Sequence, residues 1–358
     1  MDTPPATSNP LPYLTGDLPG IGGELKTDPD DFIVEEVPAY LPSGEGEHLF
    51  LWIEKRGLSA EMLLRHLGKS LGISTGDIGV AGMKDRQATT RQWVSVPARC
   101  EERLAEVDGE GVRLLDHARH SNKLKTGHLR GNRFTLLLRN VGDDALARAQ
   151  AIAAVLVQHG FPNYFGAQRF GADADNADLG FALLRGTRTP GQIPPSRRKF
   201  LLKLALSAAQ SALFNELLAR RVREGTVARV MNGDVMQVCA SGGLFTTSDP
   251  VSEQARLDHG ELAITGPMFG PKMRQPLAEP ANLEQAALAA HELTDADFLR
   301  FKKLTTGTRR PYLVRADDLE IEQTDTGLRF RFSLPPGCYA TVLLREFQKS
   351  LVNPADIL

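Results

Sequence analysis

Hydrophobic periodicity changes twice along this sequence, and this change constrains the fold more than any other feature. Strand-like alternation of apolar and polar residues occurs at 133–139 and again at 329–332. Between these two segments, helical spacing occupies the stretches 143–159, 199–223, 283–291 and 295–304. A sheet-rich beginning and end around a middle of helices and short strands predicts an α+β fold with one domain inserted into another. We place the boundaries near residues 158 and 307.

The composition is that of a water-soluble globular protein with room for two cores. The chain has 358 residues, of which 42% are hydrophobic and 24% charged. No apolar run approaches the length of a membrane span, and residues 1–20, rich in Pro and Thr, predict a loose leader rather than a signal peptide. The three cysteines are far apart, which predicts reduced thiols and a cytoplasmic location, away from any membrane.

The distribution of charge permits a nucleic-acid partner although the formal net charge is −2. Binding to a polyanion depends on where cations gather and not on their sum. Basic residues concentrate in four stretches, 119–133, 185–203, 220–229 and 300–315. Each stretch alone is typical of a solvated helix face, but the four together favour a basic cleft and an RNA partner.

An ionisable cluster lies between Gly82 and the strand-like stretch 92–96. Asp85 stands there between Lys84 and Arg86, two cations that would keep its carboxylate ionised, as a nucleophile or a base requires. Aspartate is also common in turns, and a Lys-Asp-Arg run is typical of a solvated surface. From these residues alone, the surface turn is the stronger interpretation.

Five segments in a fixed order change that interpretation, because together they resemble the TruD family of tRNA pseudouridine synthases. They are 23–38, 82–92, 131–134, 163–171 and 335–346. The resemblance implies a pseudouridine synthase catalytic domain with a mixed or antiparallel sheet, formed by residues 21–157 and 308–358. It also implies an inserted α/β TRUD domain at 158–307, with a cleft between the two domains.

The resemblance further implies roles for particular residues. Asp85 is then the catalytic carboxylate and Lys26 its ion-pair partner, while the uracil pocket contains Phe32, Asn132, Phe134 and Tyr339. Aromatic faces can offset the cost of extracting a base from its stack. The alternative for the aromatic residues is ordinary core packing. The family usually has Phe at position 339, and the hydroxyl of Tyr339 needs a partner when it is buried.

Four further residues of these segments receive weaker assignments. Neighbouring residues of an extended chain point in opposite directions, so we expect Lys84 to face phosphate or solvent rather than Asp85. Asn163, Gln168 and Arg169 are expected to shape the cleft or to hold the junction between the domains.

The implied reaction converts a uridine of tRNA, usually uridine 13, to pseudouridine. It is an isomerisation, so no cofactor is expected, and the carboxylate either attacks the anomeric carbon or removes a ribose proton to give a glycal. We expect neither a nucleotide nor a metal: Gly68-Lys69-Ser70 lacks the first glycine of a phosphate loop, and His117 and His120 have ligand spacing on a helix but no further ligand. We expect a monomer.

Two other functions remain as alternatives. One is a non-catalytic RNA-binding or RNA-folding factor, which would tolerate the loss of Asp85. The other is a nucleoside or glycoside hydrolase, which needs a second carboxylate at the scissile bond. Glu35 or Glu36 could supply it, but their acidic neighbours indicate that both face solvent.

Overall fold

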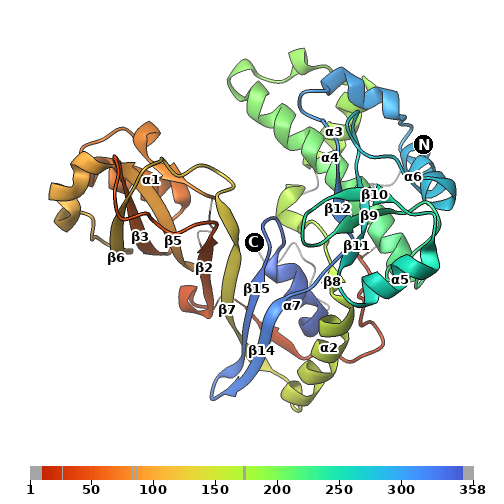
Figure 1. Cartoon of the computed structure of the whole chain (residues 1–358), viewed down its shortest axis with the longest axis horizontal. Coiled ribbons are helices and arrows are strands. Elements are labelled where there is room, and N and C mark those ends of the chain that lie inside the picture. Colours follow the sequence, from red (N-terminus) through yellow and green to blue (C-terminus); the bar gives the residue numbers. More distant parts are fainter. Residues whose placement is uncertain (1–9, 26, 83, 85–86, 172–174, 350–358) are drawn as a thin grey trace. The chain divides into compact units, whose positions relative to one another are not determined.

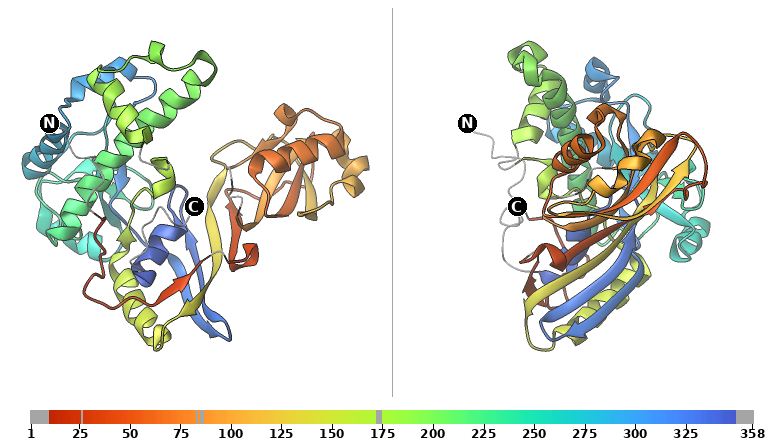
Figure 2. Two further views of the ribbon diagram at one scale, coloured as in Figure 1. Left: turned by 180° about the vertical axis from the view of Figure 1, so that it is seen from behind. Right: turned by 90° about the vertical axis from the view of Figure 1, so that its left-hand side faces the viewer.

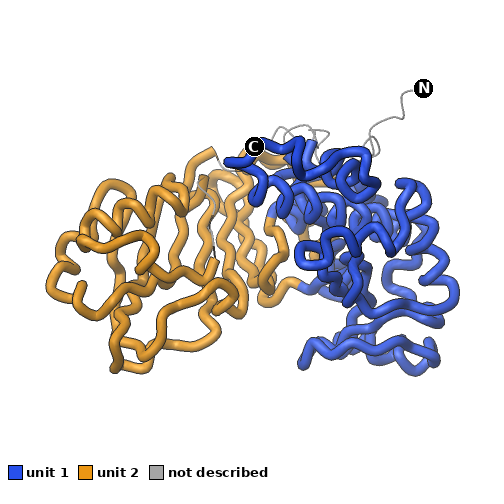
Figure 3. Tube along the Cα trace, turned by 90° about the horizontal axis from the view of Figure 1, so that it is seen from above, with its two compact units in different colours: residues 1–19, 154–315, 341–358 blue, residues 20–153, 316–340 orange. Residues whose placement is uncertain are grey.

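The computed structural model describes residues 10–25, 27–82, 84, 87–171 and 175–349 (Figure 1). Its contacts divide the chain into two compact units, coloured separately in Figure 3. Unit 2 comprises residues 20–153 and 316–340, and unit 1 comprises residues 1–19, 154–315 and 341–358. The chain is of the α+β class, as its periodicity predicts.

Unit 2 is built on one mixed sheet. Within the described part of the chain its strands are β1 (Gly22–Glu24), β2 (Phe32–Pro38), β3 (His48–Arg56), β4 (Gly79–Val80), β5 (Thr89–Pro97), β6 (Val112–His120), β7 (Leu129–Val141), β14 (Asp317–Thr324) and β15 (Gly327–Leu334). Seven of them follow the order β14-β15-β7-β2-β5-β3-β6, with β1 beside β7 and β4 beside β5. Only β2 and β5 pair in parallel among these described strands. Figure 2 shows how the long strand β7 runs between β2 and β15.

The helix α1 (Ala60–Leu71) covers one face of this sheet. Ser59 caps its first turn by accepting a hydrogen bond from the Met62 amide, and Gly72 ends it in the left-handed conformation that glycine adopts without strain. Gly68-Lys69-Ser70 is therefore the last turn of a helix and not a phosphate loop. Short 3-10 helices complete the unit: η1 (Pro29–Asp31), η2 (Thr75–Asp77) and η3 (Ala98–Glu106).

Strand alternation gives the sheet two distinct faces. The apolar side chains that pack under α1 come from alternate positions of β3 and β5: Leu49, Leu51, Ile53, Val94 and Val96. The positions between them point to the other face, where Phe50 and Trp93 pack with Leu124 and the half-buried Trp52. Each strand thus divides its side chains between two environments.

Unit 1 is built around one long helix. Its helices include α3 (Asp175–Arg185), α4 (Pro195–Arg223), α5 (Pro250–Asp258) and α6 (Ala278–Ala290), and its 3-10 turns include η4 (Ala167–Arg169), η5 (Pro190–Gln192) and η6 (Asp295–Phe301). Its strands β9 (Val235–Val238), β10 (Leu244–Thr246), β11 (Leu262–Met268) and β12 (Thr308–Pro311) form one sheet. β8 (Phe161–Pro162) pairs with β13 (Leu313–Val314). The inward side of α4 is fully buried at Leu206, Leu213, Phe214 and Leu218.

The ends of the chain behave differently from the sequence-based expectation. The chain crosses between the units at four places: after residue 19, within α2 (Ala145–His159), after residue 315 and near the start of α7 (Ala340–Gln348). The carboxylate of Glu346, on α7, accepts hydrogen bonds from the amides of Leu14 and Thr15, both at 3.1 Å. Residues 10–19 are therefore tied down rather than loose, because a buried carboxylate satisfies their backbone. The division into units groups most of α7 with unit 1, and the assignment of residues 308–358 to a catalytic domain stays a prediction.

No helix within the described ranges combines the length and the apolar character that crossing a membrane requires.

The packing of α3 against α4 depends on a glycine. A Cβ atom added to Gly180 would lie 2.1 Å from the carbonyl oxygen of Ala205 and 2.8 Å from the Cβ of Ala209. Both atoms belong to α4 and cannot move aside by a rotamer change, so a side chain at position 180 forces the two helices apart.

We predict that Gly180→Ala lowers the free energy of unfolding by about 1–3 kcal/mol, measured by urea titration. Gly191→Ala is the matched control, because its Cβ would meet nothing closer than the Thr189 hydroxyl at 3.7 Å. We expect the control to change stability by less than about 0.5 kcal/mol. Equal losses in the two variants would contradict the close crossing of α3 and α4.

Candidate active site

The pairing of β2 with β7 brings two of the distinctive sequence segments together. The two strands run antiparallel, with Val34 opposite Phe134 and Glu36 opposite Asn132. Opposed residues of a ladder point to the same face of the sheet, and so do residues two apart on one strand. Phe32, Asn132 and Phe134, which the resemblance assigns to one pocket, therefore share a face.

The aromatic residues on this face contact one another. Phe32 meets Phe134 edge to face, with 6.3 Å between ring centroids, and Phe134 stacks on Phe332 of β15 at 5.4 Å. Phe32 is 3% exposed and Phe134 is 6% exposed. Both rings contribute to the core of unit 2, and their assignment to a uracil pocket stays a prediction.

The structure corrects the expectation for Lys84. Its side chain is only 7% exposed, its Nζ lies 3.4 Å from Oε2 of Glu36, and it donates a hydrogen bond to Oδ1 of Asn132. Lys84 is thus turned away from solvent, because the sheet presents a carboxylate and an amide to it. Glu36 was also expected to face solvent, yet it is 2% exposed.

Other buried polar side chains lie on the same face of the sheet as Glu36. Thr90 of β5 pairs with Val34, Gln92 follows two residues later, and Lys55 of β3 lies opposite Thr90. All three are at most 1% exposed. The ammonium of Lys55 donates to the carbonyl of Leu58 at 2.7 Å. The face is thus apolar at its flanks and polar in its middle.

Burial sets the ionisation of Glu36. It raises the pKa of this carboxyl above the ordinary glutamate value, because a charge is less stable away from water, and the Lys84 ammonium offsets this only in part. Glu36 is consequently a buried carboxylate whose pairing with Lys84 compensates only in part for the loss of water.

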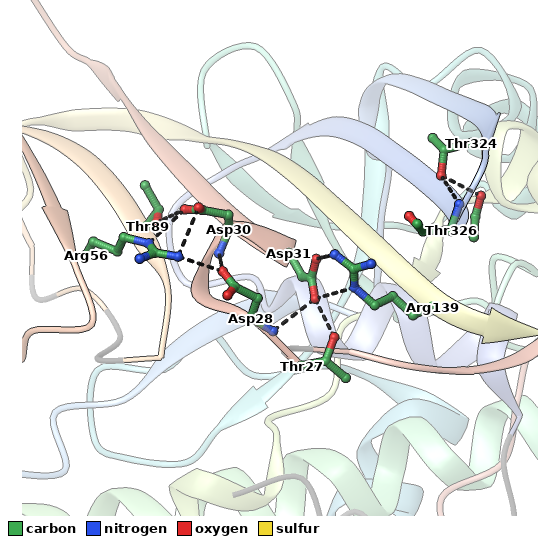
Figure 4. A network of polar contacts seen from close by, with 10 residues as sticks. Thr27, Asp28, Asp30, Asp31, Arg56, Thr89, Arg139, Thr324 and Thr326 are labelled. Carbon is green, nitrogen blue, oxygen red and sulfur yellow. Dashed lines mark hydrogen bonds and ion pairs between the residues drawn. The ribbon is translucent and has the colours of Figure 1, made fainter.

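A second polar cluster anchors the segment that leads into β2 (Figure 4). Arg139 of β7 binds Asp31 through two hydrogen bonds of 2.9 and 2.7 Å, and Thr27 donates to the same carboxylate at 2.5 Å. Arg56 of β3 contacts both Asp28 and Asp30. These bonds fix the turn at η1 and with it the start of β2.

The remaining predicted residues lie in different places. Asp85 and Lys26 lie outside the described residues. Tyr339 is half-buried in the short segment between β15 and α7, five residues after Leu334, which pairs with Asn132. The fold thus brings together Phe32, Asn132, Phe134 and Lys84. The segment that carries Tyr339 starts next to them, at Leu334.

Asn163 and Arg169 have structural partners in unit 1. Asn163 is buried and donates to the carbonyl of Pro311 at 3.0 Å, while Arg169 binds the Ser207 hydroxyl. Gln168 is exposed. The contacts of Asn163 and Arg169 stabilise unit 1 itself, and a role in a cleft remains a prediction for all three residues.

The two histidines singled out by spacing are not on a helix. His117 and His120 lie on β6, where residues three apart point to opposite faces of the sheet. Within the described ranges, no group of three or more His, Cys, Asp or Glu side chains is arranged to hold a metal ion.

Comparison with known proteins decides the family. The family model "tRNA pseudouridine synthase D (TruD)" matches residues 10–189 and 196–347. The chain belongs to the TruD family. Its sequence is 46% identical over 340 residues to the tRNA pseudouridine synthase D of Anaeromyxobacter dehalogenans, covering 95% of this chain and 97% of that one. It is 42% identical over 339 residues to the Thermus thermophilus protein of the same name, covering 94% and 92%.

The fold agrees with that assignment. A crystal structure of a Methanosarcina mazei protein, described as a candidate tRNA pseudouridine synthase D, superposes with a TM-score of 0.78. The alignment covers 96% of each chain at 24% sequence identity. The resemblance seen in five short segments of sequence is therefore confirmed at the level of family and fold.

The burial of Glu36 beside Lys84 was missed although the sequence held a signal for it. Phe32 and Val34 are apolar and alternate, so position 36 falls on the same buried face of a strand. The acidic neighbours obscured that pattern, because Glu35 points to the opposite face and pairs there with Arg91. Strand parity, rather than local charge, indicates the burial of Glu36.

The Asp31 cluster has a defined pH dependence. Burial alone would raise the pKa of Asp31, but hydrogen bonds from Arg139, Thr27 and the Asp28 amide outweigh it, so the pKa lies below its ordinary value. Because the pKa of Asp31 is lower in the folded state, its ionised carboxylate stabilises the protein at pH values above the unfolded-state pKa of about 4. This stabilisation is lost as the pH falls through the folded-state pKa.

We therefore predict that Asp31→Asn costs about 2 kcal/mol of unfolding free energy at pH 7 and distinctly less at pH 3. Urea titrations at the two pH values measure the difference. Asp325→Asn, in the exposed turn between β14 and β15, is the control and should be neutral at both. A cost for Asp31→Asn that does not depend on pH would mean that its charge is not what stabilises the turn.

Proposed function

We propose that this TruD chain converts a uridine of tRNA, at position 13, to pseudouridine, with Asp85 as the essential carboxylate. Membership of a family of tRNA pseudouridine synthases supports the reaction class, and relatives that carry this name cover almost the whole chain. Uridine 13, base flipping and the role of Asp85 are the finer parts of the proposal.

The observation that carries the proposal is the convergence on one face of the sheet. Strand β2 supplies Phe32, strand β7 supplies Asn132 and Phe134, and the loop between β4 and β5 supplies Lys84. Asp85 directly follows Lys84 in the sequence. Asp85, the proposed catalytic residue, is thus the immediate sequence neighbour of Lys84, whose side chain is bound in this cluster.

The chemistry needs a carboxylate beside the ribose and a pocket for the detached base. In the proposed reaction, Asp85 either attacks the anomeric carbon or removes a ribose proton, and the bond from that carbon to N1 of uracil breaks with its electron pair going to N1. The base then turns, and its C5 bonds to the same ribose carbon as the Asp85 ester bond breaks or, by the other route, as the glycal regains its ribose proton. The C5 proton is then lost and N1 takes up a proton, which restores the proton count. No atom is oxidised and every bond is exchanged within the nucleoside, so the reaction as written requires no cofactor.

The other site residues have supporting roles in the proposal. Lys26 pairs with Asp85 and keeps it ionised. Phe32, Phe134 and Tyr339 offer aromatic contact to the flipped uracil, at about 1–3 kcal/mol per stacked base. Asn132 binds the polar edge of the base.

We predict that Asp85→Asn, which keeps the shape of the side chain, lowers the rate of pseudouridine formation in a tRNA transcript at least about 100-fold. Position-specific pseudouridine mapping measures it, and Asp77→Asn, an exposed aspartate of η2, is the control. A near-normal rate in Asp85→Asn would exclude the mechanism. Release of free uracil by the wild type would indicate a hydrolase, and binding without any product an RNA-binding factor.

The basic stretch 185–203 supports tRNA as the partner. It contains six cationic residues and no acidic one. Phe200, near the start of α4, is 66% exposed among Arg197, Lys199 and Lys203, which are exposed as well. Cations beside an exposed aromatic ring suit a phosphate backbone with an accessible base.

We predict that Lys199→Glu weakens tRNA binding several-fold and reduces the slope of log affinity against log salt by about one. Filter binding over a range of salt concentrations measures both quantities. Lys69→Glu, an exposed helical lysine of α1, is the matched control. If Lys199→Glu and Lys69→Glu weaken binding equally, the effect comes from the overall charge of the protein and the α4 surface is not a tRNA contact.

A further inference from the structure

We propose that Glu36, Lys84 and Asn132 form a positioning relay, in which Glu36 holds Lys84 and Lys84 fixes the amide of Asn132 as a hydrogen-bond donor to a carbonyl oxygen of the target base. This inference rests on the proposed function and narrows it. It makes Asn132 a donor only, although an asparagine side chain can both donate and accept.

The first step is the position of Lys84. Its Nζ lies 3.4 Å from Oε2 of Glu36, and the two side chains are 7% and 1% exposed. A buried lysine placed between a carboxylate and an amide has far less freedom than a lysine in solvent, and leaving its charge without a counter-ion would be costly. Glu36 therefore determines where the ammonium of Lys84 lies.

The second step is the orientation of the amide. An ammonium group has three donors and no acceptor, so the atom of Asn132 that it contacts must be the carbonyl oxygen, Oδ1. The amide is planar, and its Nδ2 consequently points away from Lys84. Rotating the amide by 180° would bring two donors face to face, which the charge of Lys84 opposes strongly.

The third step is what a fixed donor recognises. Pyrimidine bases offer carbonyl oxygens as acceptors, and a buried donor that meets no acceptor loses the full value of its hydrogen bond. An amide free to rotate would accommodate either a donor or an acceptor. Because Lys84 fixes the amide of Asn132, its Nδ2 can only donate, and the partner on the base must be a carbonyl oxygen.

The surroundings of Glu36 hold further polar groups. Thr90, Gln92 and Lys55 share its face, Lys55 donates to the carbonyl of Leu58, and the backbone of Trp93 lowers the pKa of Glu36 through a hydrogen bond. Buried ion pairs are often no more stabilising than apolar residues of equal size. A buried Glu-Lys pair that contacts a pocket amide is therefore better explained by positioning than by stability.

The first experiment compares Glu36→Gln with Glu35→Gln. Glu35 is the adjacent acid on the opposite face of the sheet, where it pairs with Arg91 and Arg133, so it matches the chemistry but not the relay. Glu36→Gln leaves the buried Lys84 charge without its counter-ion and should lower the melting temperature, so activity is measured at a temperature where every variant is fully folded. There we expect Glu36→Gln to lower kcat/KM for pseudouridine formation about 10- to 100-fold and Glu35→Gln to leave it unchanged. Adding Asn132→Ala to Glu36→Gln should cost nothing beyond Asn132→Ala alone. Additive losses, or normal activity of Glu36→Gln, would overturn the relay.

The second experiment tests the relay by measuring RNA binding, without catalysis. tRNA transcripts carry uridine, 2-thiouridine or 4-thiouridine at the target position, and their affinities are measured on the Asp85→Asn protein, with and without Glu36→Gln. Sulfur accepts hydrogen bonds poorly, so one of the two thio substitutions should weaken binding about tenfold when Glu36 is present, and not when it is replaced. The same sensitivity should vanish in Asp85→Asn/Asn132→Ala. Equal affinities for all three RNAs, or a preference that survives Asn132→Ala, would refute the relay.

The two experiments separate the relay from the function on which it rests. A wild type that forms no pseudouridine, while Asp85→Asn still discriminates the thio-substituted RNAs through Glu36, would refute the proposed reaction and retain the relay. If the wild type forms pseudouridine but Asp85→Asn binds the uridine and thio-substituted RNAs equally well, the proposed reaction is retained and the relay is refuted. Lys84→Arg, which keeps charge and donors, should preserve more of the discrimination than Lys84→Met.

Discussion

The register between β2 and β7 is the constraint on which the rest of unit 2 depends. It pairs seven consecutive residues of β2, from Phe32 to Pro38, with β7, and it decides which side chains of the two strands share a face. A shift of one residue would send Phe32, Val34 and Glu36 to the opposite face and leave Asn132 without its neighbours. The buried aromatic contacts oppose such a shift, because Phe134 packs against both Phe32 and Phe332. The core that stabilises the sheet is thus the element that assembles the site.

Polar groups in the middle of this face carry a cost that their surroundings offset. Glu36, Lys84, Thr90 and Gln92 are removed from water, and groups of this kind are expensive unless they find partners. Apolar packing under α1 on one flank and the phenylalanines on the other supply the compensating burial. The Asp31–Arg139 bonds add to this by fixing the approach to β2. The apolar burial on both flanks offsets the free-energy cost of burying polar groups in the centre of the sheet.

Much of the fold could be predicted from local pattern, and the departures have a common cause. The helix expected at 199–223 spans Pro195–Arg223, and the strand expected at 133–139 spans Leu129–Val141. β7 extends beyond its apolar core because β1, β2 and β15 supply hydrogen-bond partners along its length. Local pattern cannot show contacts between distant residues: Thr15 binds Glu346 across 331 positions, and Lys84 meets Asn132 across 48. The order of residues 10–19 and the burial of Lys84 were missed for this reason.

The partners of Lys84 bear on the charge of the proposed catalytic aspartate. The ammonium of Lys84 pairs with Glu36 and donates a hydrogen bond to Asn132, so part of its positive charge is compensated within the cluster. In the proposed mechanism, a second cation helps the carboxylate of Asp85 to remain ionised near neutral pH. Lys26 is the cation that the family resemblance proposes, and the residue after it, Thr27, is held through Asp31 to β7. In the proposed mechanism the two lysines have separate roles: Lys84 orients the amide of Asn132 that binds the base, and Lys26 keeps the carboxylate of Asp85 ionised beside the ribose.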